Sequence, residues 1–150
     1  MPIKAENRAL YPADWQAVRL RILQRAGYRC EHPGCMARQY SVGWWITDPN
    51  TQAWRWSPAW GQNDNPRTYQ EARQMAAELD HDRSEEGPKP IVIVLTIAHL
   101  NHDPTDNRDD NLAAMCQRHH LAYDSDHRRE TAYRTRKNKA GTADLFEAAP

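Results

Sequence analysis

Four residues with thiol or imidazole side chains occur as two close pairs that lie far apart in the chain. Cys30 and Cys35 are separated by four residues, and Cys116 and His119 by two. A Pro-Gly dipeptide between the first two cysteines favours a tight turn that brings both thiolates toward one point. Two such pairs are typical of a closed, tetrahedral structural zinc site. The sequence therefore predicts a zinc ion that joins two distant segments.

Cys30, Cys35 and Cys116 are all the cysteines in the chain. Three is too few, and an odd number, for a disulfide framework. Two alternatives stay open. The cysteines could be buried without a metal, and His32, which lies inside the first turn, could replace His119 as the fourth ligand.

The chain of 150 residues is long enough for one domain with a modest core, so we expect a single domain over 1–150. Its longest apolar run, 91–97, is much shorter than the ~20 residues that a membrane-spanning helix requires. The first eight residues contain no apolar signal segment. We therefore expect a cytoplasmic protein without membrane association.

The apolar pattern predicts α-helices and at least one buried strand. Helical spacing and ordinary start and stop signals predict helices at 11–28, 69–79, 111–123 and about 125–138. The β-branched run 91–97 predicts a well-buried strand. Residues 36–68 have no sustained period, which predicts loops with a short hairpin at 52–57. The acidic segment 80–90 is expected to be an exposed linker.

Tryptophans gather in the loop-rich segment. Five of the six are Trp44, Trp45, Trp54, Trp56 and Trp60. We expect them to pack as a small satellite core, because buried structural tryptophan is the commoner case. Stacking on nucleic-acid bases is one alternative. An adaptor that binds another protein through residues 44–60 is another.

Charge is balanced overall and uneven locally. Twenty basic and twenty acidic residues give a formal net charge of zero, which argues against a whole surface built for polyanions. Residues 128–139, however, contain six basic residues and one acidic residue, whereas 64–86 contain seven acidic residues and three basic ones. This distribution suits local contact with phosphate, with a solvated helix face as the alternative.

Four of the seven histidines and one cysteine fall between His99 and His120. His99 is followed by eleven residues to Asn111 and eight more to His120, across an expected strand, loop and helix. This pattern resembles the HNH nuclease motif. The two ligand pairs resemble the zinc-containing branch that is common among phage and prophage HNH endonucleases.

The resemblance covers about 14–36 and 91–127, and it implies the fold class. We expect an α+β protein with a small ββα-metal core, a structural zinc site and flanking helices. Residues 37–90 would be a loop-rich insertion, and about 125–138 a basic C-terminal helix. The implied activity is metal-dependent hydrolysis of DNA phosphodiester bonds.

The resemblance also implies a function for each motif residue. His99 would be the general base that takes a proton from water, since imidazole titrates near neutral pH. Asn111 would orient the loop or His99. His120 would bind a catalytic divalent ion, Mg²⁺ or another, that stabilises the charge developing on the phosphate.

One position departs from the family pattern. Many members have a metal-binding Asp directly before the first histidine, and this chain has Ala98 there. Asp124, four residues after His120 on the same helical face, is the first candidate replacement, followed by His102 and Asp103. Without a working substitute, the chain would be a non-catalytic, zinc-stabilised nucleic-acid-binding module, which is our alternative.

DNA is the expected partner. The predicted phosphate contacts, which would give affinity without base recognition, are Arg128, Arg129, Arg134 and Arg136. A phage or host protein bound through the insertion is left open.

Overall fold

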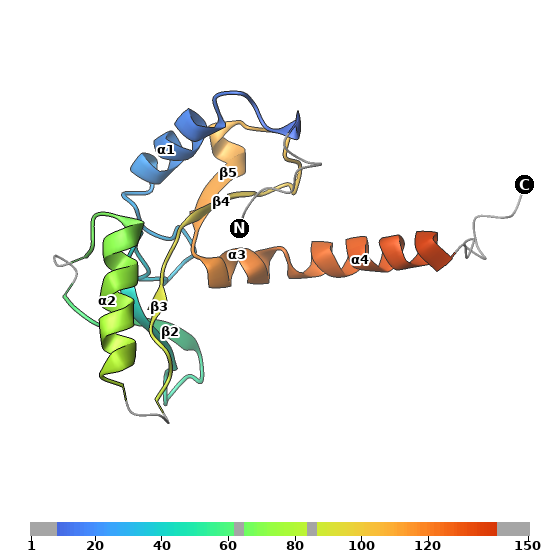
Figure 1. The fold of residues 1–150 in the computed structure, drawn as a ribbon. Helices are drawn as coiled ribbons and strands as arrows, with labels where there is room; N and C mark the ends of the chain where they lie inside the picture. Colours follow the sequence, from blue (N-terminus) through green and yellow to red (C-terminus); the bar gives the residue numbers. More distant parts are fainter. Residues whose placement is uncertain (1–8, 62–64, 84–86, 141–150) are drawn as a thin grey trace, which may run out of the picture. The chain divides into compact units, whose positions relative to one another are not determined.

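Helix α1 is the first element of the chain that contributes residues to the core. The computed structural model describes residues 9–61, 65–83 and 87–140. Helix α1 spans Trp15–Arg25 (Figure 1), inside the predicted helical segment. It ends where the sequence predicts, because Gly27 adopts a left-handed φ of 58° and the Tyr28 N–H donates to the Leu23 carbonyl at 2.8 Å. This arrangement is a Schellman motif, which satisfies carbonyls left unpaired at a helix end.

The described residues form a small α+β fold with four α-helices and two antiparallel sheets. In one sheet the strand order is β2-β1-β3, with β1 at Val42–Thr47, β2 at Trp54–Pro58 and β3 at Ile91–Val92. The other sheet pairs β4 (Thr96–His99) with β5 (Leu112–Met115). Helix α1 packs against β5, and helix α2 (Tyr69–His81) packs against β1 and β3 (Figure 1).

Contacts divide the chain into two compact units, Met1–His120 and Leu121–Pro150. The core of the first unit combines the buried face of α1 with residues of both sheets. Its largest members with almost no exposed surface are Ile22, Leu23, Ile93, Leu95 and Leu112. The second unit contains helix α4 (Ser125–Ala140), which confirms the helix expected at about 125–138. Within the described ranges, no helix has the length and apolar character needed to cross a membrane.

The predicted strand over 91–97 is wrong as one continuous element. It divides into β3 and β4, and the residues between them find other hydrogen-bond partners. The Leu95 N–H donates to Gln39 Oε1 at 2.6 Å, and the Val94 N–H donates to Gln117 Oε1 at 3.2 Å. Two glutamine side chains therefore satisfy backbone groups that a strand would have paired with a neighbour.

The predicted helix over 111–123 is wrong in its first half. Leu112–Met115 form strand β5, all four residues being buried, and helix α3 covers only Gln117–Tyr123. The short 3-10 turn η2, Asp109–Asn111, precedes β5. The alanines of this segment favour a helix in isolation, but pairing with β4 inside the core overrides that preference.

The insertion is more ordered than its sequence predicts. Strand β1 lies in a stretch expected to be loop, and it pairs with β2 from Gly43 opposite Pro58 to Thr47 opposite Trp54. The hairpin is therefore longer than expected. The segment 52–57 overlaps only its second strand, β2, and β1 supplies the first. The two strands approach closely at Gly43, where a Cβ atom would lie 2.1 Å from the Ser57 carbonyl oxygen.

The tryptophans of the insertion do not form a satellite core. Trp56 is buried in the main core, and Trp45 packs against it. Trp54 is half-exposed, but the Arg118 guanidinium lies 4.5 Å from the centre of its ring. This cation–π contact covers one face of the ring, so that face is not open to a nucleic-acid base.

Candidate metal centre

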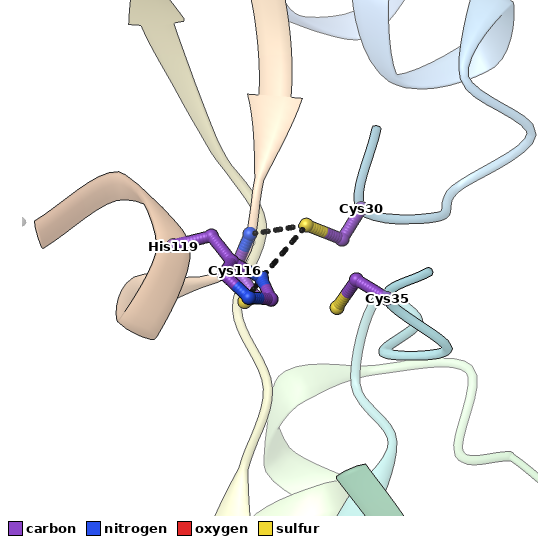
Figure 2. Close-up of side chains that lie close together, drawn as sticks. All are labelled: Cys30, Cys35, Cys116 and His119. Carbon is purple, nitrogen blue, oxygen red and sulfur yellow. Dashed lines mark hydrogen bonds between the residues drawn. The ribbon is translucent and has the colours of Figure 1, made fainter. Parts of the chain in front are cut away.

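The first ligand pair lies on a short antiparallel turn that follows α1. The Cys30 N–H donates to the Ala37 carbonyl at 2.9 Å, and the Cys35 N–H donates to the His32 carbonyl at 3.0 Å. Gly34 takes a left-handed φ of 73°, which a residue without Cβ adopts readily. We call residues 30–35 the knuckle. Its backbone closes tightly, so both thiols lie on the same side of the turn (Figure 2).

The second pair comes from the end of β5 and the start of α3. The Cys116 N–H donates to Cys30 Sγ at 3.3 Å, which ties this segment to the knuckle. His119 Nδ1 lies 3.2 Å from Cys116 Sγ and 3.6 Å from Cys30 Sγ. Figure 2 shows the four side chains around a common point, and their ligand atoms all lie within 4.8 Å of one another.

This geometry fits a tetrahedral metal site. Zinc bonds of about 2.3 Å to sulfur and about 2.0 Å to nitrogen place ligand atoms roughly 3.6 Å apart at tetrahedral angles. The distance from His119 Nδ1 to Cys30 Sγ matches that value, and the distance to Cys116 Sγ is somewhat shorter. Cys30 and Cys116 are buried, and Cys35 and His119 are half-buried. The four residues predicted as ligands could therefore hold a metal ion such as zinc.

Ionisation of the thiols is strongly coupled. Hydrogen bonds from the Cys116 thiol and then the Cys35 thiol hold the pKa of Cys30 far below its usual value. Hydrogen bonding to Cys30 and Cys35 and burial raise the pKa of Cys116. Zinc binding would displace thiol protons, so the affinity of the cluster for zinc should fall as the pH is lowered.

Aromatic rings surround the histidine of this cluster. The His32 ring stacks on the His119 ring with centroids 3.8 Å apart, and its Nδ1 lies 3.0 Å from the Pro33 carbonyl oxygen. His32 therefore packs against His119 and is not part of the ligand group, contrary to the alternative considered from sequence. Trp45 meets His119 edge-on at 5.7 Å, which brings the insertion next to the centre.

Arg25 and Glu31 fasten the knuckle to β5, and no sequence pattern singles out either residue. Arg25 Nη2 donates to the Glu31 carboxylate at 3.0 Å and to the Leu112 carbonyl at 2.6 Å. Glu31 also hydrogen-bonds to Ala114. These contacts bring the two ligand pairs together independently of a metal.

His99 ends strand β4 and is held between aromatic rings. Only 9% of its surface is exposed. The Trp15 ring stacks on the imidazole at 5.6 Å, and the Tyr11 ring meets it edge-on at 5.8 Å. Helix α1 and the residues before it therefore fix the plane of the His99 ring.

The hydrogen bonds of Asn107 determine the tautomer of His99. The Asn107 amide nitrogen donates to the Thr105 carbonyl at 3.1 Å, which directs the amide oxygen, Oδ1, toward His99 Nε2 at 3.1 Å. An amide oxygen only accepts, so Nε2 carries the hydrogen. In the neutral ring the lone pair then lies on Nδ1. Asn107 was not among the residues singled out from sequence.

Asn111 closes the loop between β4 and β5. Its side chain is 7% exposed, and its Oδ1 accepts the Asn101 N–H at 3.0 Å. Its amide nitrogen donates to Asn101 Oδ1 at 2.9 Å and to the Asp106 carbonyl at 2.8 Å. These bonds hold the loop that also carries Asn107.

His120 contacts strand β4 through Thr96. Its Nδ1 lies 2.6 Å from the Thr96 hydroxyl, which in turn lies 3.3 Å from the Met115 carbonyl. A hydroxyl that donates to that carbonyl can accept the Nδ1–H of His120. Such a bond is typical of a histidine whose other nitrogen binds a cation.

Two of the remaining candidates for a catalytic ion, His102 and Asp103, lie in the loop after β4. Asp103 accepts hydrogen bonds from the Thr105 hydroxyl and backbone, which lower the pKa of its carboxyl group. His102 has a left-handed φ of 59° in the same loop. Asp124 belongs to the second unit. Across the described ranges, the cysteine–histidine cluster alone combines three or more metal-ligand residues.

The arginines predicted to contact DNA lie on α4. Arg128, Arg129, Arg134 and Arg136 are all exposed. Arg129 lies 3.6 Å from Asp126 in the same helix. Their contact with DNA stays a prediction.

No family model, curated protein or solved structure matches this chain. Its class therefore follows from the molecule itself. The fold and the site define a small α+β protein with a candidate three-cysteine, one-histidine metal centre.

Proposed function

We propose that the protein is a metal-dependent HNH-type endonuclease that hydrolyses DNA phosphodiester bonds. The observation that carries the proposal is the setting of His99, an imidazole fixed by Trp15 with its lone pair on Nδ1. Two further features support it. Strands β4 and β5 and helix α3 follow one another in the order that the HNH resemblance implies, and Asn111 closes the intervening loop.

The chemistry that we assign to the chain is proton transfer. His99 Nδ1 takes a proton from water, and the resulting hydroxide attacks phosphorus while the bond to the leaving oxygen breaks. The Asn107 carbonyl accepts the Nε2–H and stabilises the imidazolium that forms. A divalent ion would supply charge neutralisation at the phosphate. The described residues do not provide a complete ligand set for this ion. The ligands of the ion take no part in the proton transfer to His99.

The Cys30–Cys35–Cys116–His119 cluster would hold zinc with a structural function. All four positions of a tetrahedral ion are filled by protein ligands, which leaves no open position for substrate. Zinc would fix the start of α3 against the knuckle. Since His120 directly follows His119, the same ion would also hold His120 in place.

Plasmid cleavage tests the proposal. The zinc-loaded protein is incubated with supercoiled plasmid and Mg²⁺, Mn²⁺ or Ni²⁺, beside His99→Ala and the exposed matched control His81→Ala. We expect an added ion to support nicking by the wild type and His81→Ala, and nicking to be lost in His99→Ala, with zinc content and circular dichroism unchanged. Absence of nicking with every ion, or equal nicking by His99→Ala, would contradict the proposal.

A non-catalytic, zinc-stabilised nucleic-acid-binding module is the second candidate. It is favoured by Ala98, which cannot bind a metal, and by the lack of a second ligand set in the described residues. This candidate predicts salt-dependent DNA binding without cleavage. Affinity that His99→Ala leaves unchanged, together with no nicking by the wild type, would favour it over the endonuclease.

A further inference from the structure

A cavity of about 520 Å³ lies beside α1 and shares no residue with the metal centre. Its walls come from α1, from the residues on both sides of the knuckle and from 65–67. Its volume falls within the range of small-molecule sites. Arginines and tyrosines dominate the lining, and none of the described lining residues is acidic. The cavity therefore offers positive charge and aromatic surface together.

Two of its arginines carry positive charge that no described carboxylate neutralises. Arg19 is half-buried, and its Nη2 donates to the Leu95 carbonyl at 3.2 Å, which fixes the side chain at the wall. Arg67 is exposed at the rim. Within the described ranges, neither forms an ion pair with a carboxylate. Phosphate matches the charge and the planar donor geometry of such guanidinium groups.

Two tyrosines of the cavity have strained backbone. Tyr28 and Tyr40 have φ values of 55° and 63°, in the left-handed region that bulky residues rarely adopt. Glycine or asparagine would fit either position with less strain. Backbone strain of this kind collects at binding sites. Two of the four residues other than glycine that have a positive φ in the described chain thus lie on one cavity, which supports a binding function for it.

A second cavity, of about 150 Å³, shares Arg38 and Asn65 with the first. Trp56 forms part of its wall. The Trp56 side chain is 5% exposed, and its Nε1 has no hydrogen-bond partner, which is true of no other buried side-chain nitrogen or oxygen in the described residues. Because this atom has almost no exposed surface, it does not open into the cavity, and the second cavity contributes volume and not a hydrogen-bond donor.

We propose that the two adjoining cavities form a binding site for one nucleotide unit. Its phosphate would bind Arg19 and Arg67, and its base would lie against the rings of Tyr28 and Tyr40. The same contacts would form whether the nucleotide is free or part of a DNA strand. It does not depend on the nuclease activity proposed above.

Binding measurements on the zinc-loaded full chain test the site, with no other divalent ion present so that cleavage cannot interfere. The probes are the four deoxynucleoside monophosphates, the matching nucleosides and inorganic phosphate. Calorimetry measures the binding of each probe. At least one monophosphate is expected to bind about tenfold more tightly than its nucleoside and than phosphate. If no monophosphate exceeds inorganic phosphate, the nucleotide site is wrong.

Variants locate the binding. Arg67→Gln should weaken monophosphate binding about tenfold, whereas Arg73→Gln, an exposed arginine on α2 outside the cavity, should leave it unchanged. Tyr28→Gly should weaken binding without lowering the melting temperature, because glycine relieves the strained φ. Equal effects of the two arginine variants would overturn the proposal, as would unchanged binding by Tyr28→Gly.

A short oligodeoxynucleotide distinguishes the two sources of the ligand. If Arg67→Gln weakens binding of the oligonucleotide and the monophosphate by a similar factor, the site holds a unit of a DNA strand. If only the monophosphate is affected, the site holds a free nucleotide, and both outcomes support the proposal. Loss of plasmid cleavage with intact monophosphate binding would count against the endonuclease and not against this site.

Discussion

Glu31 and Ala114 are joined by two hydrogen bonds. The Glu31 N–H donates to the Ala114 carbonyl at 2.8 Å, and the Ala114 N–H donates to Glu31 Oε2 at 2.6 Å. Glu31 directly follows one candidate ligand, Cys30, and Ala114 lies two residues before another, Cys116. The pairing therefore brings the two buried thiols together through one backbone and one side-chain hydrogen bond, and a metal would bind a site that is largely formed.

Loss of one thiolate should release zinc. Cys116→Ser leaves three ligands on a closed site, and it should lower the melting temperature by about 10 °C or more, because metal binding contributes directly to folding. Elemental analysis and thermal unfolding followed by circular dichroism measure both effects. His32→Ala, which removes a ring that stacks on His119, should keep its zinc. Unchanged zinc content in Cys116→Ser would contradict the ligand assignment.

Asn107 should matter for catalysis and little for DNA affinity. Asn107→Ala removes the acceptor that holds the hydrogen on His99 Nε2, so the rate of nicking at saturating plasmid should fall about tenfold to hundredfold. Asn107→Asp retains an acceptor, and its negative charge stabilises the imidazolium, so we expect activity with a rate–pH profile displaced to higher pH. The same rate in Asn107→Ala and the wild type would exclude this positioning function.

Asn111 should be important for stability. Asn111→Ala removes the three side-chain hydrogen bonds that join this buried residue to Asn101 and Asp106 of the loop. The expected loss in the free energy of unfolding is about 2–4 kcal/mol. Urea unfolding measures it, with Asn50→Ala in an exposed turn as the control. A loss no larger than that of the control would show that the loop does not depend on this side chain.

Gly43 should tolerate no side chain. A Cβ there would lie 2.1 Å from the Ser57 carbonyl oxygen and 2.8 Å from Pro58 Cα, both backbone atoms. Gly43→Ala should therefore cost about 2–3 kcal/mol of unfolding free energy. Gly27→Ala, where a Cβ meets nothing within 4 Å, should cost only the strain of a left-handed φ, about 1 kcal/mol. Urea unfolding that ranks the two in reverse would contradict the close approach of β1 and β2.

The ion pair between Arg21 and Asp109 should make the free energy of unfolding depend on pH in the acidic range. Arg21 Nη2 lies 2.7 Å from Asp109 Oδ1, and this hydrogen bond lowers the pKa of Asp109. Its stabilisation is therefore complete above the unfolded pKa of about 3.9 and is lost as the pH falls through the folded pKa. The stability difference between the wild type and Arg21→Gln should shrink over that range. A difference that is constant with pH would rule out the pair, and Arg73→Gln serves as the control.

Part of the fold could be predicted because its signals are local. Helix α1 follows from apolar spacing and from Gly27, whose backbone freedom ends the helix. The knuckle follows from a turn that forms within six residues. The predictions of a strand over 91–97 and a helix over 111–123 were wrong because both segments depend on distant partners. Gln39 and Gln117 bind the backbone of the first segment, and β4 pairs with the second.

The same division applies to the candidate sites. The four residues of the candidate metal centre were predicted from the sequence, with His32 as an alternative to His119, since metal coordination demands particular side chains at short spacings. Three other features arise from the folded chain: Asn107 faces His99, Glu31 fastens the knuckle to β5, and arginines and tyrosines from separate segments share a cavity. These contacts join residues whose local sequence carries no signal, because hydrogen bonding and packing between segments depend on how the whole chain folds.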